Sequence, residues 1–178
     1  GQSLAALLAT LESYGGWGQI IGPHGAGKST LLRCLANELE KRGRAVAWLP
    51  IQPGQRSLSN FAKLTEAASS VQVLVDGYEQ LSWWTRARLR RCCRRRSAGL
   101  LVTAHTDVGL PELARAEVTW TRVESLVSQL LIGFRPLVSA ADVRGCYERH
   151  PTNLREILFA LYDLYELRRR LGATDERT

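Results

Sequence analysis

The chain has 178 residues, of which 45% are apolar and 23% are charged, a composition typical of one globular domain or of one domain with a small helical addition. Its apolar runs are far shorter than the ~20 residues that span a bilayer, so we expect no transmembrane helix and no membrane partner. The net charge is +7, and residues 81–101 hold seven arginines and no acid, so the remainder has a net charge of zero. This local basicity indicates an anionic partner.

The first residues of the chain and its cysteines support further predictions. Methionine is absent, including at position 1, so we expect a chain that lacks its native start or carries a tag remnant at Gly1. The first residues have no basic region and no long apolar region, which argues against a signal peptide. Because the cysteines show no metal-binding spacing and two are adjacent, we expect reduced thiols in a cytoplasmic protein. They are Cys34, Cys92, Cys93 and Cys146.

Strand and helix patterns alternate through the first two thirds of the chain. Leucines at helical spacing, short β-branched runs and loops with glycine or proline mark the elements. In chain order we predict a helix at 2–13, a strand at 17–21, a helix at 28–41, a strand at 45–49, a helix at 58–70, a strand at 71–75, a helix at 79–96, and strands at 99–103 and 118–123. This alternation predicts an α/β fold with a parallel, doubly wound sheet.

From residue 124 onward the pattern predicts helices alone. They cover 124–132, a segment that starts at Ser139 and stops before Pro151, and 153–170. Ser139 and Asp142 have the spacing of a capping box, which supports a helix start there. We therefore predict an α/β domain at 1–123 and a small helical domain at 124–178.

Residues 22–29 read G-P-H-G-A-G-K-S and satisfy the G-x-x-x-x-G-K-[ST] pattern of a phosphate-binding loop. Glycines let backbone amides wrap a polyphosphate, and the following helix points its N-terminus at the same anion. Lys28 would contact the β- and γ-phosphates, and Ser29 would ligate Mg²⁺. We predict ATP with Mg²⁺ as the ligand, and GTP stays open. The predicted nucleotide-binding residues are Gly22, Pro23, His24, Gly25, Ala26, Gly27, Lys28, Ser29 and Thr30.

An acidic residue ends the apolar strand predicted at 71–75. We expect Asp76 to organise the Mg²⁺ shell together with Ser29, although an aspartate capping a turn would look the same. A water-orienting acid usually follows directly, but that position is Gly77. Glu79 is the nearest acid, and it would either polarise water or stabilise the first turn of a helix.

Polar residues also end the strand predicted at 99–103. Thr103, His105 and Thr106 would emerge at the carboxyl edge of the sheet, where open α/β sheets bind ligands. His105 is therefore a candidate for contacting the γ-phosphate or the attacking water, or else a turn histidine. Arg115 would either reach a neighbouring subunit's phosphate, if the chain oligomerises, or form a surface salt bridge.

Taken together, GPHGAGKST, LVDG with a downstream glutamate, LLVTAH and the helical region resemble the AAA+ class of P-loop ATPases. Residues 152–158, T-N-L-R-E-I-L, resemble the G-N-x-R-E-L segment that carries the family's second sensor arginine. The resemblance implies a three-layer α/β/α core with a small helical lid, and a γ-phosphate contact from Arg155. It also implies that Thr103 or His105 stands at the first sensor position. Ordinary helix capping by Asn153, with Arg155 in solvent, is the alternative.

Arginines recur at helical spacing in the segment predicted as a helix at 79–96. Arg86, Arg90 and Arg94 gather on one side of a helical wheel with Trp83 among them. Such a stripe is a candidate polyanion-binding face for nucleic acid or for an acidic protein. Since only 3 of the 24 basic residues are lysines, a solvated face in an arginine-rich protein would have the same sequence.

These residues favour a Mg²⁺-dependent ATPase that couples its nucleotide state to a partner. Glu79, His105 and Arg155 are the predicted catalytic residues, and Ser29 and Asp76 are the predicted metal site. Two other classes stay open: a nucleotide-binding switch with negligible hydrolysis, which Gly77 favours, and a small-molecule kinase.

Overall fold

The computed structural model describes residues 3–52, 54–58 and 71–175. Its contacts divide the chain into two compact units. The first, the core unit, comprises Gly1–Gly22 and Lys28–Ala116, and the second, the helical unit, comprises Pro23–Gly27 and Glu117–Thr178. Most of the segment predicted as a helix at 58–70 lies outside the described residues.

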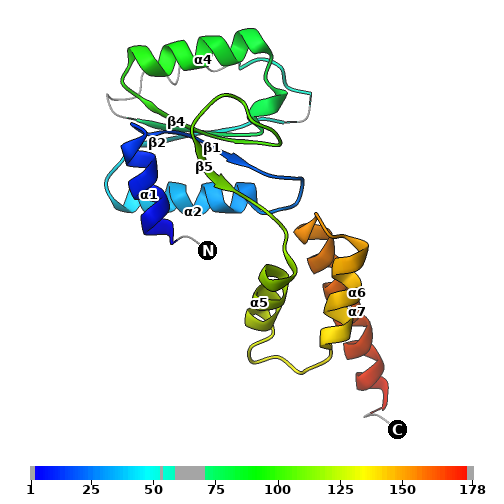
Figure 1. Ribbon diagram of the computed structural model, residues 1–178. Coiled ribbons are helices and arrows are strands. Elements are labelled where there is room, and N and C mark those ends of the chain that lie inside the picture. The colour runs from blue at the N-terminus through cyan, green and yellow to red at the C-terminus, as the bar shows by residue number, and fades with distance from the viewer. Residues whose placement is uncertain (1–2, 53, 59–70, 176–178) are drawn as a thin grey trace. The chain divides into compact units, whose positions relative to one another are not determined.

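A five-stranded parallel sheet forms the centre of the core unit (Figure 1). The strands are β1 (Trp17–Ile21), β2 (Val46–Pro50), β3 (Gln72–Asp76), β4 (Gly99–Ala104) and β5 (Glu112–Arg115). Their order is β2-β3-β4-β1-β5, so β1 lies between β4 and β5. Because the strands are parallel, their carboxyl ends lie at the same edge of the sheet, which brings the ends of β1, β3 and β4 together. The predicted α/β fold with a parallel sheet is confirmed.

Helices cover both faces of this sheet. In Figure 1, α1 (Leu4–Ser13) and α2 (Lys28–Lys41) lie on one face, and α4 (Trp83–Arg95) lies on the other. The buried side chains divide in the same way, because successive residues of a strand point to opposite faces. Leu101 of β4 packs with the α1 and α2 leucines, whereas Leu100 and Val102 pack with Leu89 of α4. The core unit is therefore a three-layer α/β/α structure.

Two predicted elements differ from the structure. The helix predicted at 79–96 is a short 3-10 turn, η1 (Tyr78–Gln80), followed by α4, because Leu81 is extended and the Ser82 side chain caps a new helix by accepting from Thr85 N at 3.2 Å. The strand predicted at 118–123 is also wrong. Those β-branched residues run into a helix, and Val123 is fully buried there among helices. The fifth strand is instead β5, three of whose residues pair with β1 across a register shift at Leu113.

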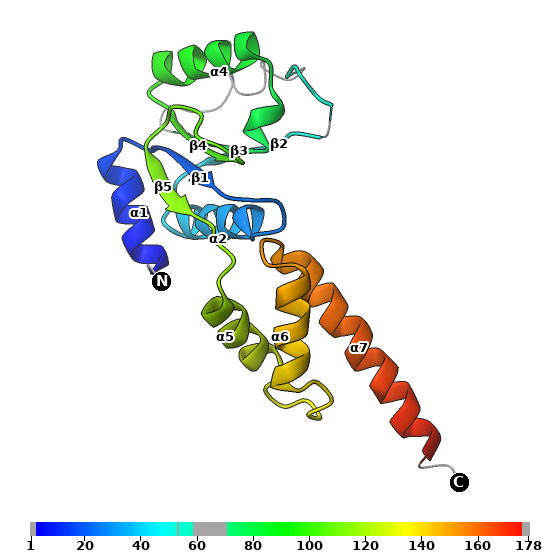
Figure 2. The same ribbon diagram turned by 45° about the vertical axis from the view of Figure 1, so that its right-hand side comes forward.

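Three helices make up most of the helical unit: α5 (Trp120–Leu130), α6 (Ala140–Arg149) and α7 (Leu154–Asp175) (Figure 2). They share a small core. The capping box predicted at the start of α6 is present, with Ser139 Oγ accepting from Asp142 N at 3.2 Å. Arg168 of α7 forms a salt bridge with Asp142 at 2.6 Å, which ties α7 to the start of α6.

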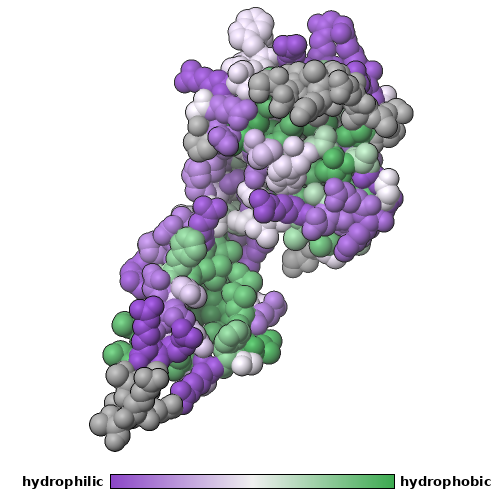
Figure 3. Space-filling model, turned by 180° about the vertical axis from the view of Figure 1, so that it is seen from behind, coloured by the Kyte–Doolittle hydropathy of each residue, from purple (hydrophilic) through white to green (hydrophobic). Residues whose placement is uncertain are grey.

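Apolar side chains also reach the surface of the helical unit (Figure 3). Between α5 and α7 they line a groove of about 660 Å³, whose walls include Leu130, Phe134 and Tyr162. Among the described residues no helix is both long and apolar enough to cross a membrane.

Candidate functional site

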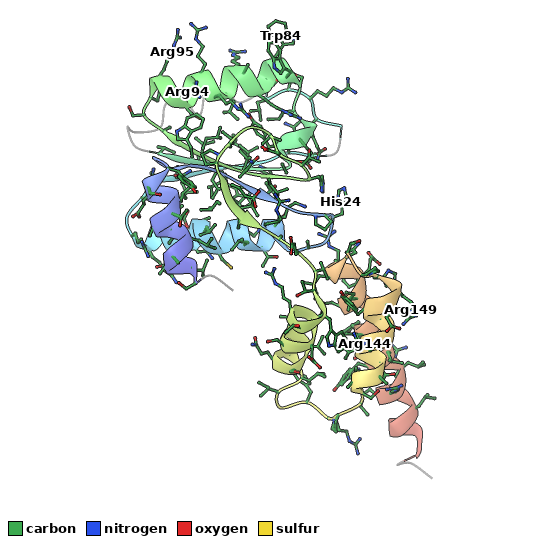
Figure 4. All side chains as sticks on the ribbon, viewed as in Figure 1. His24, Trp84, Arg94, Arg95, Arg144 and Arg149 are labelled. Carbon is green, nitrogen blue, oxygen red and sulfur yellow. The ribbon has the colours of Figure 1, made fainter. Side chains whose placement is uncertain are left out.

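The glycine-rich loop connects β1 to α2, as predicted. A Cβ on Gly22 would overlap the carbonyl oxygen of Ala116, so a side chain has no room there. Gly25 and Gly27 have φ angles of +71° and +90°, which L side chains rarely adopt. The loop conformation thus requires glycine at three of its positions. His24, by contrast, is exposed on the loop (Figure 4).

Lys28 begins α2 and is only 8% exposed. Its Nζ donates to the carbonyl oxygen of Gly22 at 2.6 Å and lies 3.4 Å from Nδ1 of His105. Burial lowers the pKa of Lys28 from its ordinary value, while the nearby carboxylates of Glu79 and Asp76 oppose that shift. The Lys28 ammonium is therefore buried at the carboxyl edge of the sheet, where it contacts Gly22 and lies beside His105.

Asp76 accepts hydrogen bonds from two hydroxyl groups on neighbouring elements. Ser29 Oγ of α2 donates to Asp76 Oδ1 at 3.0 Å, and Thr103 Oγ1 of β4 donates to the same oxygen at 2.6 Å. Thr103 in turn accepts from Gly77 N at 2.9 Å. The two residues predicted to hold Mg²⁺ are therefore in direct contact. Thr103 is the residue that orients the aspartate.

Gly77 has a φ of +85°, and a Cβ there would lie 3.0 Å from the side chain of Gln80 and 3.3 Å from the Ile51 carbonyl oxygen. This left-handed turn redirects the chain from β3 into η1. It explains why no acid stands directly after Asp76, because an L side chain would be strained and crowded in that position.

Glu79 and His105, two of the predicted catalytic residues, lie side by side. Glu79 Oε1 is 3.0 Å from His105 Nε2, and the two side chains are 23% and 27% exposed. Glu79 Oε2 is buried and has no hydrogen-bond partner among the described residues. His105 Nδ1 is 3.2 Å from the Gly22 carbonyl oxygen. The left-handed turn at Gly77 thus places the next acid beside His105, which in turn contacts Gly22 within the core unit.

Within the helical unit, the start of α7 contacts the tip of the loop. Arg155 N donates to the Gly25 carbonyl oxygen at 3.2 Å, and Asn153 Oδ1 lies where a Cβ on Gly25 would be. Asn153 Oδ1 also accepts from Glu156 N at 3.3 Å, as expected of a helix cap. The Arg155 side chain is exposed, so its predicted contact with a γ-phosphate stays a prediction. The sequence carried no signal for the approach of Asn153 to Gly25.

Arg86, Arg90 and Arg94 do not form one free stripe. Arg86 donates through Nε to the Leu81 carbonyl oxygen at 2.8 Å, and Arg90 donates to Tyr78 Oη at 3.0 Å. Both guanidinium groups also lie over the Tyr78 ring.

Two further arginines considered in the sequence have local contacts. Arg94 is exposed and lies 5.4 Å from the Trp17 ring centroid. Arg115 forms a salt bridge with Glu112, which was one of its two predicted roles.

The core unit thus has a parallel α/β/α fold with a glycine-rich loop between β1 and α2 and an acid at the end of β3. No family model matches the chain, and no curated protein matches it in sequence. Among solved structures it is similar to a DNA replication initiation factor, with a TM-score of 0.65, 16% identity, and coverage of 97% of this chain and 63% of that chain. It is also similar to AMPPCP-bound DnaA from Aquifex aeolicus, with a TM-score of 0.61, 17% identity, and coverage of 97% and 65%. The chain therefore spans less than two thirds of either structure's length, and the likeness establishes the fold.

Proposed function

We propose that this chain binds ATP with Mg²⁺ at residues 22–30 and hydrolyses it to control contact with a partner. The observation that carries the proposal is the buried Lys28 ammonium, which lies beside Gly22 and His105 at the carboxyl edge of the sheet. A triphosphate placed there would replace the Gly22 carbonyl oxygen as the acceptor for Lys28. The similar DnaA structure holds AMPPCP, an ATP analogue, which supports a nucleotide as the ligand.

Mg²⁺ would be held by Ser29 Oγ, with Asp76 and Thr103 fixing the surrounding water. Among the described residues no group of three or more His, Cys, Asp or Glu side chains could hold a metal ion. A single hydroxyl ligand supported by one carboxylate fits Mg²⁺, which keeps several waters and binds phosphate oxygens. The ion would neutralise charge that develops on the phosphate oxygens during transfer.

Glu79 is the proposed general base for hydrolysis. The buried Oε2 atom without a partner needs a hydrogen-bond donor, and a water molecule would supply one. That water would give its proton to Glu79 while its oxygen attacks the γ-phosphorus and the bond to the bridging oxygen breaks, releasing ADP and phosphate. His105 would hold Glu79 in position through the 3.0 Å contact. We further propose that Arg155 contacts the γ-phosphate.

Calorimetric titration with ATP, GTP and ADP in the presence of Mg²⁺ tests binding. Lys28→Ala should weaken ATP binding about 10- to 150-fold, because it removes a charge-assisted contact worth roughly 1.5–3 kcal/mol. Lys41→Ala is the matched control, since Lys41 ends the same helix and its side chain is 75% exposed. Unchanged affinity in a folded Lys28→Ala variant would refute the proposed site.

Phosphate release measured on the same samples tests turnover. Binding without release would favour the switch that hydrolyses negligibly, which the absence of a side chain at Gly77 also allows.

A further inference from the structure

The side of α4 that faces the β4–β5 loop carries a groove of about 600 Å³ in the core unit. Its lining runs from Trp83, the first residue of α4, to Arg94 and Arg95 at the end of that helix, and it includes Val108 of the β4–β5 loop. Five of its eight lining residues are arginines. A groove with this lining presents positive charge along one wall and an aromatic ring at its end.

The arginines of the groove have different roles. Arg86 and Arg90 donate to the Leu81 and Val108 carbonyl oxygens, so they are fixed by the fold. Arg91 and Arg95, by contrast, are exposed and stand one helical turn apart. Like charges at this spacing repel each other by a few tenths of a kcal/mol unless an anion lies between them.

No acidic residue stands between positions 81 and 101, so α4 itself offers no counter-anion. The negative end of the α4 dipole stabilises the arginines near its C-terminus, but it does not reach the first turn of the helix.

That first turn carries two exposed tryptophans. Trp83 and Trp84 are 68% and 77% exposed and contact each other edge to face, with ring centroids 4.5 Å apart. Figure 4 shows Trp84 and Arg95 projecting from the outer side of α4, away from the sheet. Exposed indole rings leave large apolar faces in water, and proteins use such rings to stack unpaired bases.

We propose that this groove binds single-stranded nucleic acid, with Trp83 stacking a base and Arg91, Arg94 and Arg95 contacting phosphates. From Trp83 to Arg95 the helix rises ~18 Å at 1.5 Å per residue. A stacked strand that rises 3.4 Å per nucleotide covers this length with about five nucleotides. Duplexes hide their base faces, so the tryptophans favour a single strand. The inference goes beyond the proposed function because it requires neither ATP binding nor hydrolysis.

The test uses fluorescence anisotropy with labelled 12-nucleotide DNA and RNA of mixed sequence, without nucleotide, at ~50 mM salt. We expect a Kd below about 100 µM for at least one of them. Three phosphate contacts predict a log–log salt slope of about −2, which is roughly an 18-fold loss of affinity between 50 and 200 mM salt. No binding at ~100 µM protein, or equal affinity for a duplex of the same length, overturns the proposal.

Two sets of variants identify the groove itself. Arg91→Ala with Arg95→Ala should reduce the salt-dependent loss to roughly 3-fold, because one phosphate contact remains. The matched control is Lys41→Ala with Arg42→Ala, which removes the same charge from the end of α2 on the other face of the sheet. If both double variants lose the same affinity for the oligonucleotide, general charge attraction explains the binding, and the assignment to this groove is wrong.

Trp83→Ala should weaken binding about 5- to 100-fold, whereas Trp83→Phe should retain most of the affinity, because a phenyl ring still stacks. Equal affinities of wild type and Trp83→Ala overturn the stacking contact. Lys28→Ala should bind the oligonucleotides as wild type does, so failure of the ATP site and failure of the groove are distinguishable.

Discussion

We predict that Glu79→Gln separates the proposed nucleotide binding from the proposed turnover. Glutamine keeps the length and shape of the side chain, so its amide can still contact His105 Nε2, which lies 3.0 Å from Glu79 Oε1. It removes the negative charge and the capacity to accept a proton from water. The buried Oε2 position without a partner would then carry a neutral group.

General-base catalysis contributes typically 10²- to 10⁴-fold, which corresponds to about 2.7–5.4 kcal/mol of activation free energy. We therefore expect Glu79→Gln to lower the rate of phosphate release at least ~100-fold. ATP affinity should be unchanged or slightly higher. The Glu79 carboxylate lies near Lys28 and would repel the triphosphate, so removing its charge removes that repulsion.

Steady-state phosphate release and calorimetric ATP binding, measured on the same preparation, give the two quantities. Glu40→Gln, a change of the same kind at an exposed position of α2, is the control and should behave as wild type. Equal phosphate release by wild type and Glu79→Gln would refute the assignment and leave His105 as the candidate.

Three further predictions concern stability. Gly77→Ala should lower the unfolding free energy by about 1–2 kcal/mol in denaturant titrations, because φ is +85°, whereas Gly145→Ala in α6 should be neutral or stabilising, since a Cβ there meets open space. Arg90→Ala should cost about 1–3 kcal/mol because it leaves Tyr78 Oη without its donor, and exposed Arg91→Ala should change stability by under ~0.5 kcal/mol. The Arg168 guanidinium holds the pKa of Asp142 well below its usual range, so this pair stabilises the helical unit above pH ~4 and loses that effect as the pH falls further. Asp142→Asn should accordingly lower Tm at pH 7, with the difference shrinking below pH ~4; a constant difference would contradict this.

Short-range signals in the sequence determined much of the proposed nucleotide site. The spacing of Gly22, Gly25, Gly27 and Lys28 specifies a loop whose backbone angles only glycine adopts readily, and β1 and α2 have the predicted bounds. The capping box at Ser139 is equally local, because its partners stand three residues apart. Such features depend on backbone geometry within a few residues, so they can be recognised without the rest of the fold.

The partners of individual side chains and strands were decided only by the tertiary structure. β5 has the sequence E-L-A-R, which lacks an apolar run, and it is a strand because it pairs with β1. The helical wheel placed Arg86 and Arg90 on one side of α4, but it could not show that backbone carbonyl groups already occupy them. Glu79 and His105 meet because parallel strands end at one edge and Gly77 turns the chain there. Periodicity gives a side chain's direction from its own element, whereas its partner depends on which elements pack beside it.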